Sequence, residues 1–316
     1  MIKPKKLHPG DTIGVVSPAS PSTAPSEVPR AKAYLENLGL HVVIGRNVNK
    51  TRGLVAASEQ DRADDLNAMF ADPQIDAVFV TQGGYGSAQI IDKIDYDNIR
   101  RHPKIFTGYS DITSLHLAIN KFCGLVTFHS CGMTRFNEED LTEYTRRQFM
   151  KAVAETTPLG RIELADKRKW LQVVGDGGVA EGEIIGGNLT LLCASMGTPY
   201  QPDLRGKLLF IEEVDSEPWI MDGCLSHLRN AGVLRDVAGV IVGECRDCVP
   251  YDYKPGYLID MHIEDVLEYY LAPLGVPVLF GLPLGHTDDM AALPLGVRAR
   301  LDCERKQLTV LESGVL

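Results

Sequence analysis

The sequence has no excess of positive charge and no long hydrophobic run. It holds 32 Lys and Arg against 42 Asp and Glu, which gives a formal net charge of −10. A phosphate-binding surface needs net Lys and Arg, so this balance argues against nucleic acid and an anionic membrane as partners. No apolar stretch approaches the roughly 20 residues that span a bilayer. Asp11 interrupts the N-terminal region before a signal-peptide core forms, so we expect no targeting segment.

Cysteine is sparse, with seven residues and no framework spacing. An odd, scattered set fits a reducing cytoplasm better than a secreted disulfide scaffold. Cys245 and Cys248 form a C-x-x-C pair, but a structural zinc site would need a second pair, and a redox motif would lie near the first βα turn. We interpret this pair as structural or incidental, and we expect a cytoplasmic protein without a metal.

The first half of the chain alternates strand and helix patterns. This order predicts a parallel sheet with helices on both faces, in which ligands bind beyond the carboxyl ends of the strands. The pattern weakens between 156 and 175, and the second half is less regular. The predicted fold is α/β, with a Rossmann-like or flavodoxin-like parallel-sheet domain at 1–155, a linker at 156–175 and a mixed α/β domain with a β-rich core at 176–316.

Ser110 lies at a predicted strand-to-helix turn. Residues 104–107 read as a buried strand, and residues 111–121 read as a helix with one apolar face. A serine in such a turn is exposed at the sheet edge, near backbone N–H groups and a helix dipole that stabilise an oxyanion. The G-x-S-x-G motif is incomplete because Ile112 replaces its second glycine. The turn fits either a nucleophile or a helix cap made by Ser110 and Asp111.

A nucleophilic serine needs a base, and that base needs an orienting carboxylate. Among the eight histidines, His286 differs by following a predicted strand in a loop with glycines ahead of it. Glu212 and Glu213 end a buried apolar strand, so one of them should have a polar partner inside the fold. A solvated loop histidine and ordinary strand-end acids are the alternatives.

A glycine-rich run covers residues 83–86, between a strand and a helix. It fails the dinucleotide fingerprint G-x-G-x-x-G because Gln89 replaces the third glycine, and we expect no cofactor. Glycine here lets a backbone N–H approach a substrate carbonyl, as an oxyanion hole requires. A tight turn that simply needs glycine is the alternative.

Taken in order along essentially the whole chain, a set of segments resembles the L,D-carboxypeptidase family of serine peptidases. These segments are Lys3-Pro4 to Gly10-Asp11 with Val15-Val-Ser-Pro18, Gly83-Gly-Tyr-Gly86, Gly108-Tyr-Ser-Asp-Ile-Thr113, Gly186-Gly-Asn-Leu189, Gly197-Thr-Pro-Tyr200, Leu209-Phe-Ile-Glu-Glu213 and Gly285-His286.

The resemblance implies a role for each matching residue. Ser110 corresponds to the nucleophile, His286 to the general base and Glu212 to the carboxylate that orients the histidine. Backbone N–H groups of Gly84 and Asp111 correspond to the oxyanion hole. The implied reaction removes the terminal D-alanine from a murein tetrapeptide in cell-wall recycling, by a homodimer without metal or cofactor.

Two alternatives remain open. Another branch of the family acts on peptidyl or aminoacyl adenylates and confers immunity to peptide–nucleotide antibiotics, and Trp170 is an aromatic residue near the segment where that branch stacks a nucleobase. The chain departs from the family pattern at Gln82 and at Ser130-Cys131-Gly132, which bears on substrate preference. A non-catalytic protein that binds a small ligand at the same strand ends is the second alternative.

Overall fold

The computed structural model describes residues 1–165, 169, 171–250 and 261–316. They form two compact units. The first comprises Met1–Leu159, Asp289–Val297 and Ser313–Leu316, and the second comprises Gly160–Asp288 and Arg298–Glu312. The sequence assigned everything from 176 onward to one domain, whereas two C-terminal segments belong to the first unit. The reason is strand pairing, because β12 (Leu293–Leu295) joins the first unit's sheet beside β5 (Thr127–His129).

The sheet of the first unit has the order β12-β5-β4-β3-β1-β2. Apart from the antiparallel β12, its strands are parallel: β1 (Thr12–Val16), β2 (His41–Ile44), β3 (Ala77–Val80), β4 (Ile105–Gly108) and β5. Strands β3 and β4 are buried throughout because helices cover both faces of the sheet. This arrangement confirms the predicted α/β class with a parallel sheet.

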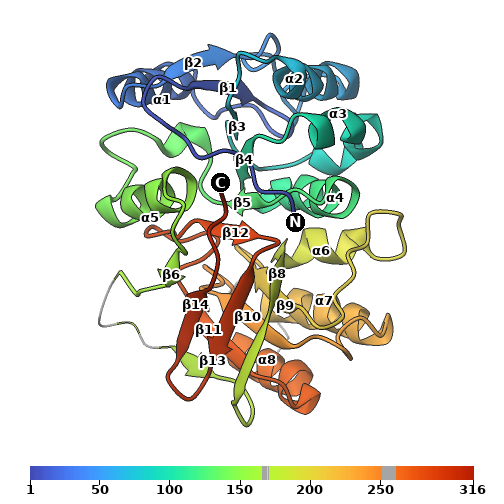
Figure 1. Cartoon of the computed structure of the whole chain (residues 1–316). Coiled ribbons are helices and arrows are strands. Elements are labelled where there is room, and N and C mark those ends of the chain that lie inside the picture. The colour runs from blue at the N-terminus through green and yellow to red at the C-terminus, as the bar shows by residue number, and fades with distance from the viewer. Residues whose placement is uncertain (166–168, 170, 251–260) are drawn as a thin grey trace. The chain divides into compact units, whose positions relative to one another are not determined.

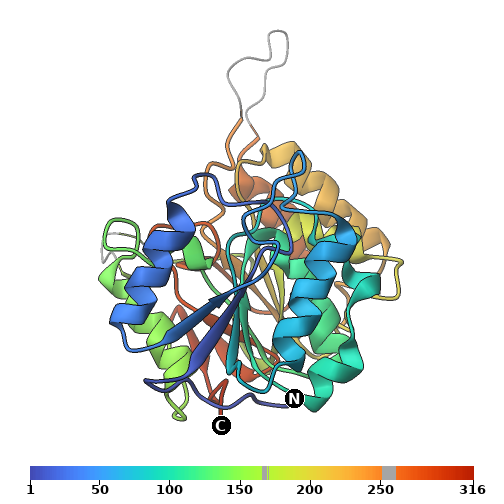
Figure 2. The same cartoon turned by 90° about the horizontal axis from the view of Figure 1, so that it is seen from above.

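The helices of the first unit divide between the two faces (Figures 1 and 2). α1 (Glu27–Asn37) and α5 (Glu143–Ala154) cover one face, and α2 (Glu59–Ala71), α3 (Tyr96–Arg101) and α4 (Thr113–Cys123) cover the other. Ser58 caps the start of helix α2, because its side chain accepts a hydrogen bond from Asp61 N. The core between α2, α3, α4 and the sheet is built from aliphatic side chains with Phe70 and Phe106.

The second unit holds a mixed sheet of order β6-β14-β13-β8-β9-β10-β11-β7. Strands β8 (Val179–Asn188), β9 (Leu208–Glu212), β10 (Gly239–Gly243) and β11 (Val278–Leu282) run parallel at its centre. β13 (Arg298–Asp302) and β14 (Gln307–Val310) form an antiparallel hairpin. The short strands β6 (Gly160–Arg161) and β7 (Gln172–Val173) lie within the segment predicted as a linker.

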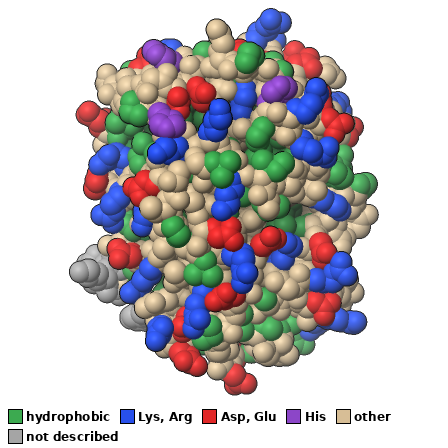
Figure 3. Space-filling model, in the orientation of Figure 1, with side chains coloured by type: hydrophobic (Ala, Val, Ile, Leu, Met, Phe, Trp, Pro, Cys, Tyr) green, Lys and Arg blue, Asp and Glu red, His purple; other side chains and the backbone are tan. Residues whose placement is uncertain are grey.

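Helices α6 (Leu189–Ser195), α7 (Pro218–Asn230) and α8 (Ile263–Leu271) pack in sequence beside that sheet (Figure 1). None of the helices in the described ranges is both long and apolar enough to cross a membrane. On the face drawn in Figure 3, acidic and basic side chains are interspersed.

Candidate active site

Ser110 lies in a strained turn between β4 and α4. Its φ is 61°, a left-handed conformation that a residue with a side chain rarely adopts. Two glycines make room for this turn. A Cβ on Gly83 would lie 2.7 Å from the Ser110 Cβ, and a Cβ on Gly108 would lie 2.8 Å from the Ile112 Cγ2. The turn therefore has the strained strand-to-helix geometry of a nucleophile elbow, although Ile112 replaces the motif's second glycine.

The buried Asp111 side chain ties this turn to the glycine-rich loop. Its Oδ2 accepts a hydrogen bond of 2.7 Å from Ser87 N, and Ser87 Oγ donates to the Asp111 carbonyl. Burial raises the pKa of the Asp111 carboxyl, while the N–H groups of Ser87 and Gly86 and the charge of Arg62 oppose that rise. The sequence predicted an oxyanion-hole N–H or a helix cap for Asp111, whereas in the structure its side chain holds the loop that carries Gly84.

Arg62 also holds this loop, and sequence reasoning missed it. Its buried guanidinium donates to the carbonyl of Pro18 at 2.6 Å and to the carbonyl of Gly86 at 2.8 Å. Burial is also the main reason that the pKa of Arg62 is lowered. A signal was present in the sequence, since Arg62 precedes Leu66 by four residues and so occupies the apolar face of α2.

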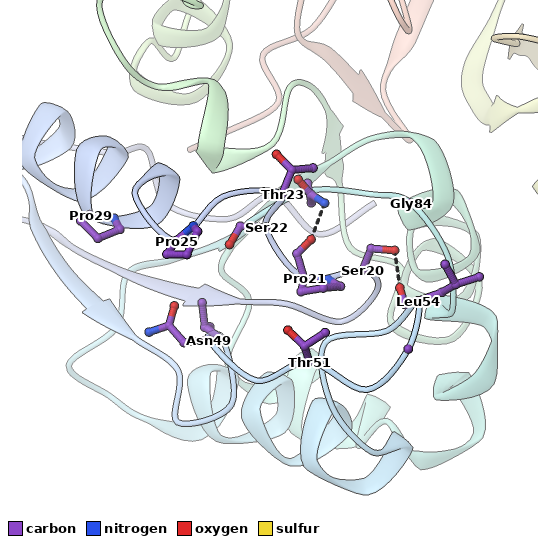
Figure 4. Close-up of a pocket in the computed structure, with 13 residues that line it drawn as sticks. Ser20, Pro21, Ser22, Thr23, Pro25, Pro29, Asn49, Thr51, Leu54 and Gly84 are labelled. Atoms are coloured by element: carbon purple, nitrogen blue, oxygen red, sulfur yellow. Dashed lines mark hydrogen bonds between the residues drawn. The ribbon is translucent and has the colours of Figure 1, made fainter.

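Gly84 and the neighbouring loops line a pocket of about 840 Å³ in the first unit (Figure 4). Gly84 has a φ of 96°, and a Cβ there would overlap the Ser20 side chain. Ser20 Oγ donates to Leu54 O at 2.6 Å and accepts from Tyr85 N at 3.0 Å. Among the described residues, the lining carries serine, threonine, asparagine, glutamine and proline side chains with Val48 and Leu54, and no charged or aromatic one. The pocket therefore suits an uncharged polar group.

Glu212 and His286 meet in the second unit. Glu212 ends β9, and His286 follows β11 in the loop that contains Gly285. The Glu212 Oε2 atom lies 2.7 Å from the His286 Nδ1 atom, and the Glu212 residue is only 1% exposed. A carboxylate at Nδ1 favours the tautomer with its proton on that nitrogen, in which Nε2 is the acceptor nitrogen. Gly285 permits this approach, because a Cβ there would lie 2.4 Å from Glu212 Oε2.

The adjacent acid, Glu213, has a different role. Its carboxylate accepts hydrogen bonds from Asn188 Nδ2 at 2.8 Å and from the Thr190 hydroxyl at 2.6 Å, at the start of α6. The sequence predicted that one of the two acids has a polar partner, and in the structure both do. Glu212 holds the histidine, whereas Glu213 holds a helix terminus.

The site residues are thus divided between the units. Ser110, Asp111 and Gly84 belong to the first unit, and Glu212 and His286 belong to the second. Trp170, the aromatic residue noted in the sequence, lies outside the described residues.

Comparisons with known proteins agree with these features. Residues 13–130 match the LD-carboxypeptidase N-terminal domain, and residues 181–301 match the LD-carboxypeptidase C-terminal domain. The "Probable murein peptide carboxypeptidase" of Bacillus subtilis is 40% identical over 99% of this chain and 95% of its own length. The chain belongs to the LD-carboxypeptidase family. This is a family of peptidases, and it includes proteins that are named as carboxypeptidases.

Two further proteins that are similar to this chain carry different names. The microcin self-immunity protein MccF of Escherichia coli is 30% identical over 96% of this chain and 94% of its own length. A wild-type apo structure of MccF matches with a TM-score of 0.87, 27% identity and full coverage of both chains. A muramoyltetrapeptide carboxypeptidase from Oxalobacter formigenes matches with a TM-score of 0.80, 26% identity and coverage of 95% and 97%.

Proposed function

We propose that this chain is a serine-type carboxypeptidase that releases the terminal D-alanine from murein tetrapeptides. The observation that carries the proposal is the buried hydrogen bond between Glu212 and His286, because it prepares an imidazole to act as a base. The strained Ser110 turn supplies the matching nucleophile. The identity to the Bacillus relative named for murein peptides supports this branch of the family.

In the proposed reaction, Ser110 Oγ attacks the carbonyl carbon of the bond between the L-centre of the diamino acid and the D-alanine. His286 Nε2 takes the serine proton, and Glu212 stabilises the imidazolium that results. Backbone N–H groups of Gly84 and Asp111 stabilise the oxyanion. His286 then protonates the leaving amine of D-alanine, and water, activated by the same histidine, hydrolyses the acyl-enzyme.

The experiment is mass spectrometry of a murein tetrapeptide incubated with wild type and with Ser110→Ala, both with a chelator present. We expect wild type alone to release D-alanine, with turnover by the variant lower by about 10⁴- to 10⁶-fold. The assignment would be wrong if Ser110→Ala kept wild-type activity. Light scattering on the same samples tests the homodimer that we propose, and fractionation of the source cells tests the proposed cytoplasmic location.

A second candidate is a peptidase that acts on aminoacyl adenylate analogues. It is favoured by the likeness to MccF, one structure of which is a complex with aspartyl sulfamoyl adenosine. The pocket beside Gly84 carries no aromatic side chain that would stack on a base. Cleavage of an aminoacyl sulfamoyl adenosine, with no release of D-alanine from the tetrapeptide, would select this second function.

A further inference from the structure

Cys245 and Cys248 form a dithiol at the carboxyl end of β10. Both thiols are free, and their side chains are hydrogen-bonded to each other. The turn at Asp247 separates them, and Cys248 Sγ also lies 3.5 Å from Arg246 O. The side chains of this C-x-x-C pair are in contact, and a disulfide spans about 4.4–6.8 Å between Cα atoms. The spacing therefore permits a disulfide without a large backbone movement.

The turn between these cysteines is connected to the strand end that carries Glu212. Arg246 forms a parallel bridge with Val214, and Asp215 N donates to Arg246 O at 3.0 Å. Asp215 is three residues beyond Glu212. A change in the turn is thus transmitted through the backbone to the segment that positions the buried carboxylate.

The same turn is also connected to the loop that carries His286. The Arg246 guanidinium donates to Asp288 Oδ1 at 2.6 Å, and Asp288 is two residues beyond His286. Arg246 lies between the two cysteines. It therefore contacts both Asp215, which follows Glu212 in the chain, and Asp288, which follows His286. This position distinguishes the dithiol from the other contacting thiols, Cys193 and Cys224, which lie on α6 and α7.

Backbone strain is concentrated at this turn. Among the described residues, five residues other than glycine have a positive φ. Three of them lie in this turn or bond to it: Asp215 (50°), Cys245 (39°) and Asp247 (56°). A fourth is Ser110. Strained residues of this kind cost of order 1–3 kcal/mol each and persist only where surrounding contacts hold them. A covalent bond formed inside the turn will therefore alter contacts that hold the segments beside Glu212 and His286.

We propose that Cys245 and Cys248 are a redox modification site whose oxidation to a disulfide by a peroxide slows the enzyme. The Cys248 sulfur, as thiolate, attacks one oxygen of hydrogen peroxide, which forms a sulfenic acid and releases hydroxide that is protonated to water. The Cys245 sulfur then attacks the sulfenic sulfur, its proton leaves with the hydroxyl as a second water, and the disulfide forms. Two thiols are oxidised and one peroxide is reduced to two waters.

The order of these steps follows from the local electrostatics. The hydrogen bond from Cys245 lowers the pKa of Cys248. The hydrogen bond with Cys248, together with burial and the charge of Glu212, raises the pKa of Cys245. The thiolate therefore forms on Cys248, and Cys245 acts as the resolving thiol.

The test oxidises the intact wild-type protein with hydrogen peroxide and maps the products by mass spectrometry. We expect a peptide that has lost two hydrogens and links Cys245 to Cys248. In parallel, kcat/KM for the tetrapeptide should fall by about 10- to 100-fold, the range expected for a small displacement of a catalytic group, and recover with dithiothreitol. The disulfide mapping does not use the tetrapeptide, whereas the kcat/KM measurement rests on the proposed function. A failure of that function is therefore distinguishable from a failure of this site.

Two variants complete the experiment. Cys245→Ser should keep the basal activity and lose the reversible response, and Cys193→Ser should keep both the activity and the response. The proposal is overturned if no Cys245–Cys248 disulfide forms, if it forms without a change in kcat/KM, or if Cys245→Ser is inactivated as fast as wild type. If Cys245→Ser does not fold, the mapped disulfide and the effect of dithiothreitol on wild type decide the question.

Discussion

The two units hold their proposed catalytic residues by different means. In the first unit the backbone positions Ser110, in a left-handed turn that depends on the missing side chains of Gly83 and Gly108. In the second unit a side chain positions the reactive group, because the buried Glu212 carboxylate holds His286. The nucleophile should therefore be sensitive to added volume at its glycine neighbours, and the base should be sensitive to removal of a charge. The following predictions separate these two sensitivities.

The largest effect expected from this comparison is at Glu212. Glu212→Gln removes the negative charge that stabilises the imidazolium, so kcat should fall by about 10²- to 10⁴-fold. The matched control is Glu213→Gln, on the same strand end, which weakens hydrogen bonds to Asn188 and Thr190. It should lower the free energy of unfolding by about 1–3 kcal/mol and leave most of kcat. Equal losses of kcat in both variants would contradict the division of roles.

The next effect tests the backbone of the first unit. Gly83→Ala places a methyl group 2.7 Å from the Ser110 Cβ, so the turn must shift and kcat/KM should fall by about 100-fold. Gly223→Ala is the control, because no atom lies within 4 Å of a Cβ at this helical position. It should leave kcat/KM unchanged and raise the free energy of unfolding by up to about 1 kcal/mol. Normal activity in Gly83→Ala would show that the turn tolerates the added volume.

A smaller effect concerns the free energy of unfolding in acid, which depends on the buried His116 near the Ser110 turn. Burial lowers the pKa of His116 from its ordinary value of 6.5 to about 4, and its Nε2 lies 2.9 Å from Gly108 O. Because the folded pKa is depressed, this contribution to stability is present above pH 6.5 and is lost as the pH falls toward 4. Between pH 7 and pH 5 the free energy of unfolding should fall by about 2 kcal/mol more in wild type than in His116→Gln. Urea titrations at both pH values measure it, and parallel losses would exclude His116.

The sequence predicted which residue types form the candidate site and that they lie at strand ends. The apolar runs of β3, β4 and β9 predicted buried strands, and the structure has these strands buried, with candidate site residues at or just beyond their ends. It could not separate the roles of Glu212 and Glu213, because only the fold decides which acid faces the histidine and which faces α6. It also missed the pairing of β12 with β5, since a three-residue strand carries almost no pattern of its own.

The side chains that support the site were also beyond the sequence. Arg62 and Asp111 act through long-range hydrogen bonds to the loop at 86–87, and the place of Arg62 on the apolar face of α2 does not reveal which groups it meets there. The sequence predicts a structural or incidental role for the C-x-x-C pair, because the pair is far from the first βα turn along the chain and no second pair exists. In the fold, its turn lies against the segments that follow Glu212 and His286.

We propose that the serine of one unit, Ser110, is activated by the histidine of the other, His286. The direct measurement is the rate at which a fluorophosphonate labels the protein, with peptide mapping of the adduct, for wild type, Glu212→Gln and His286→Ala. The account predicts an adduct on Ser110 that forms at least about 100-fold more slowly in His286→Ala and also more slowly in Glu212→Gln. An adduct on another residue, or equal labelling rates in wild type and His286→Ala, would contradict it.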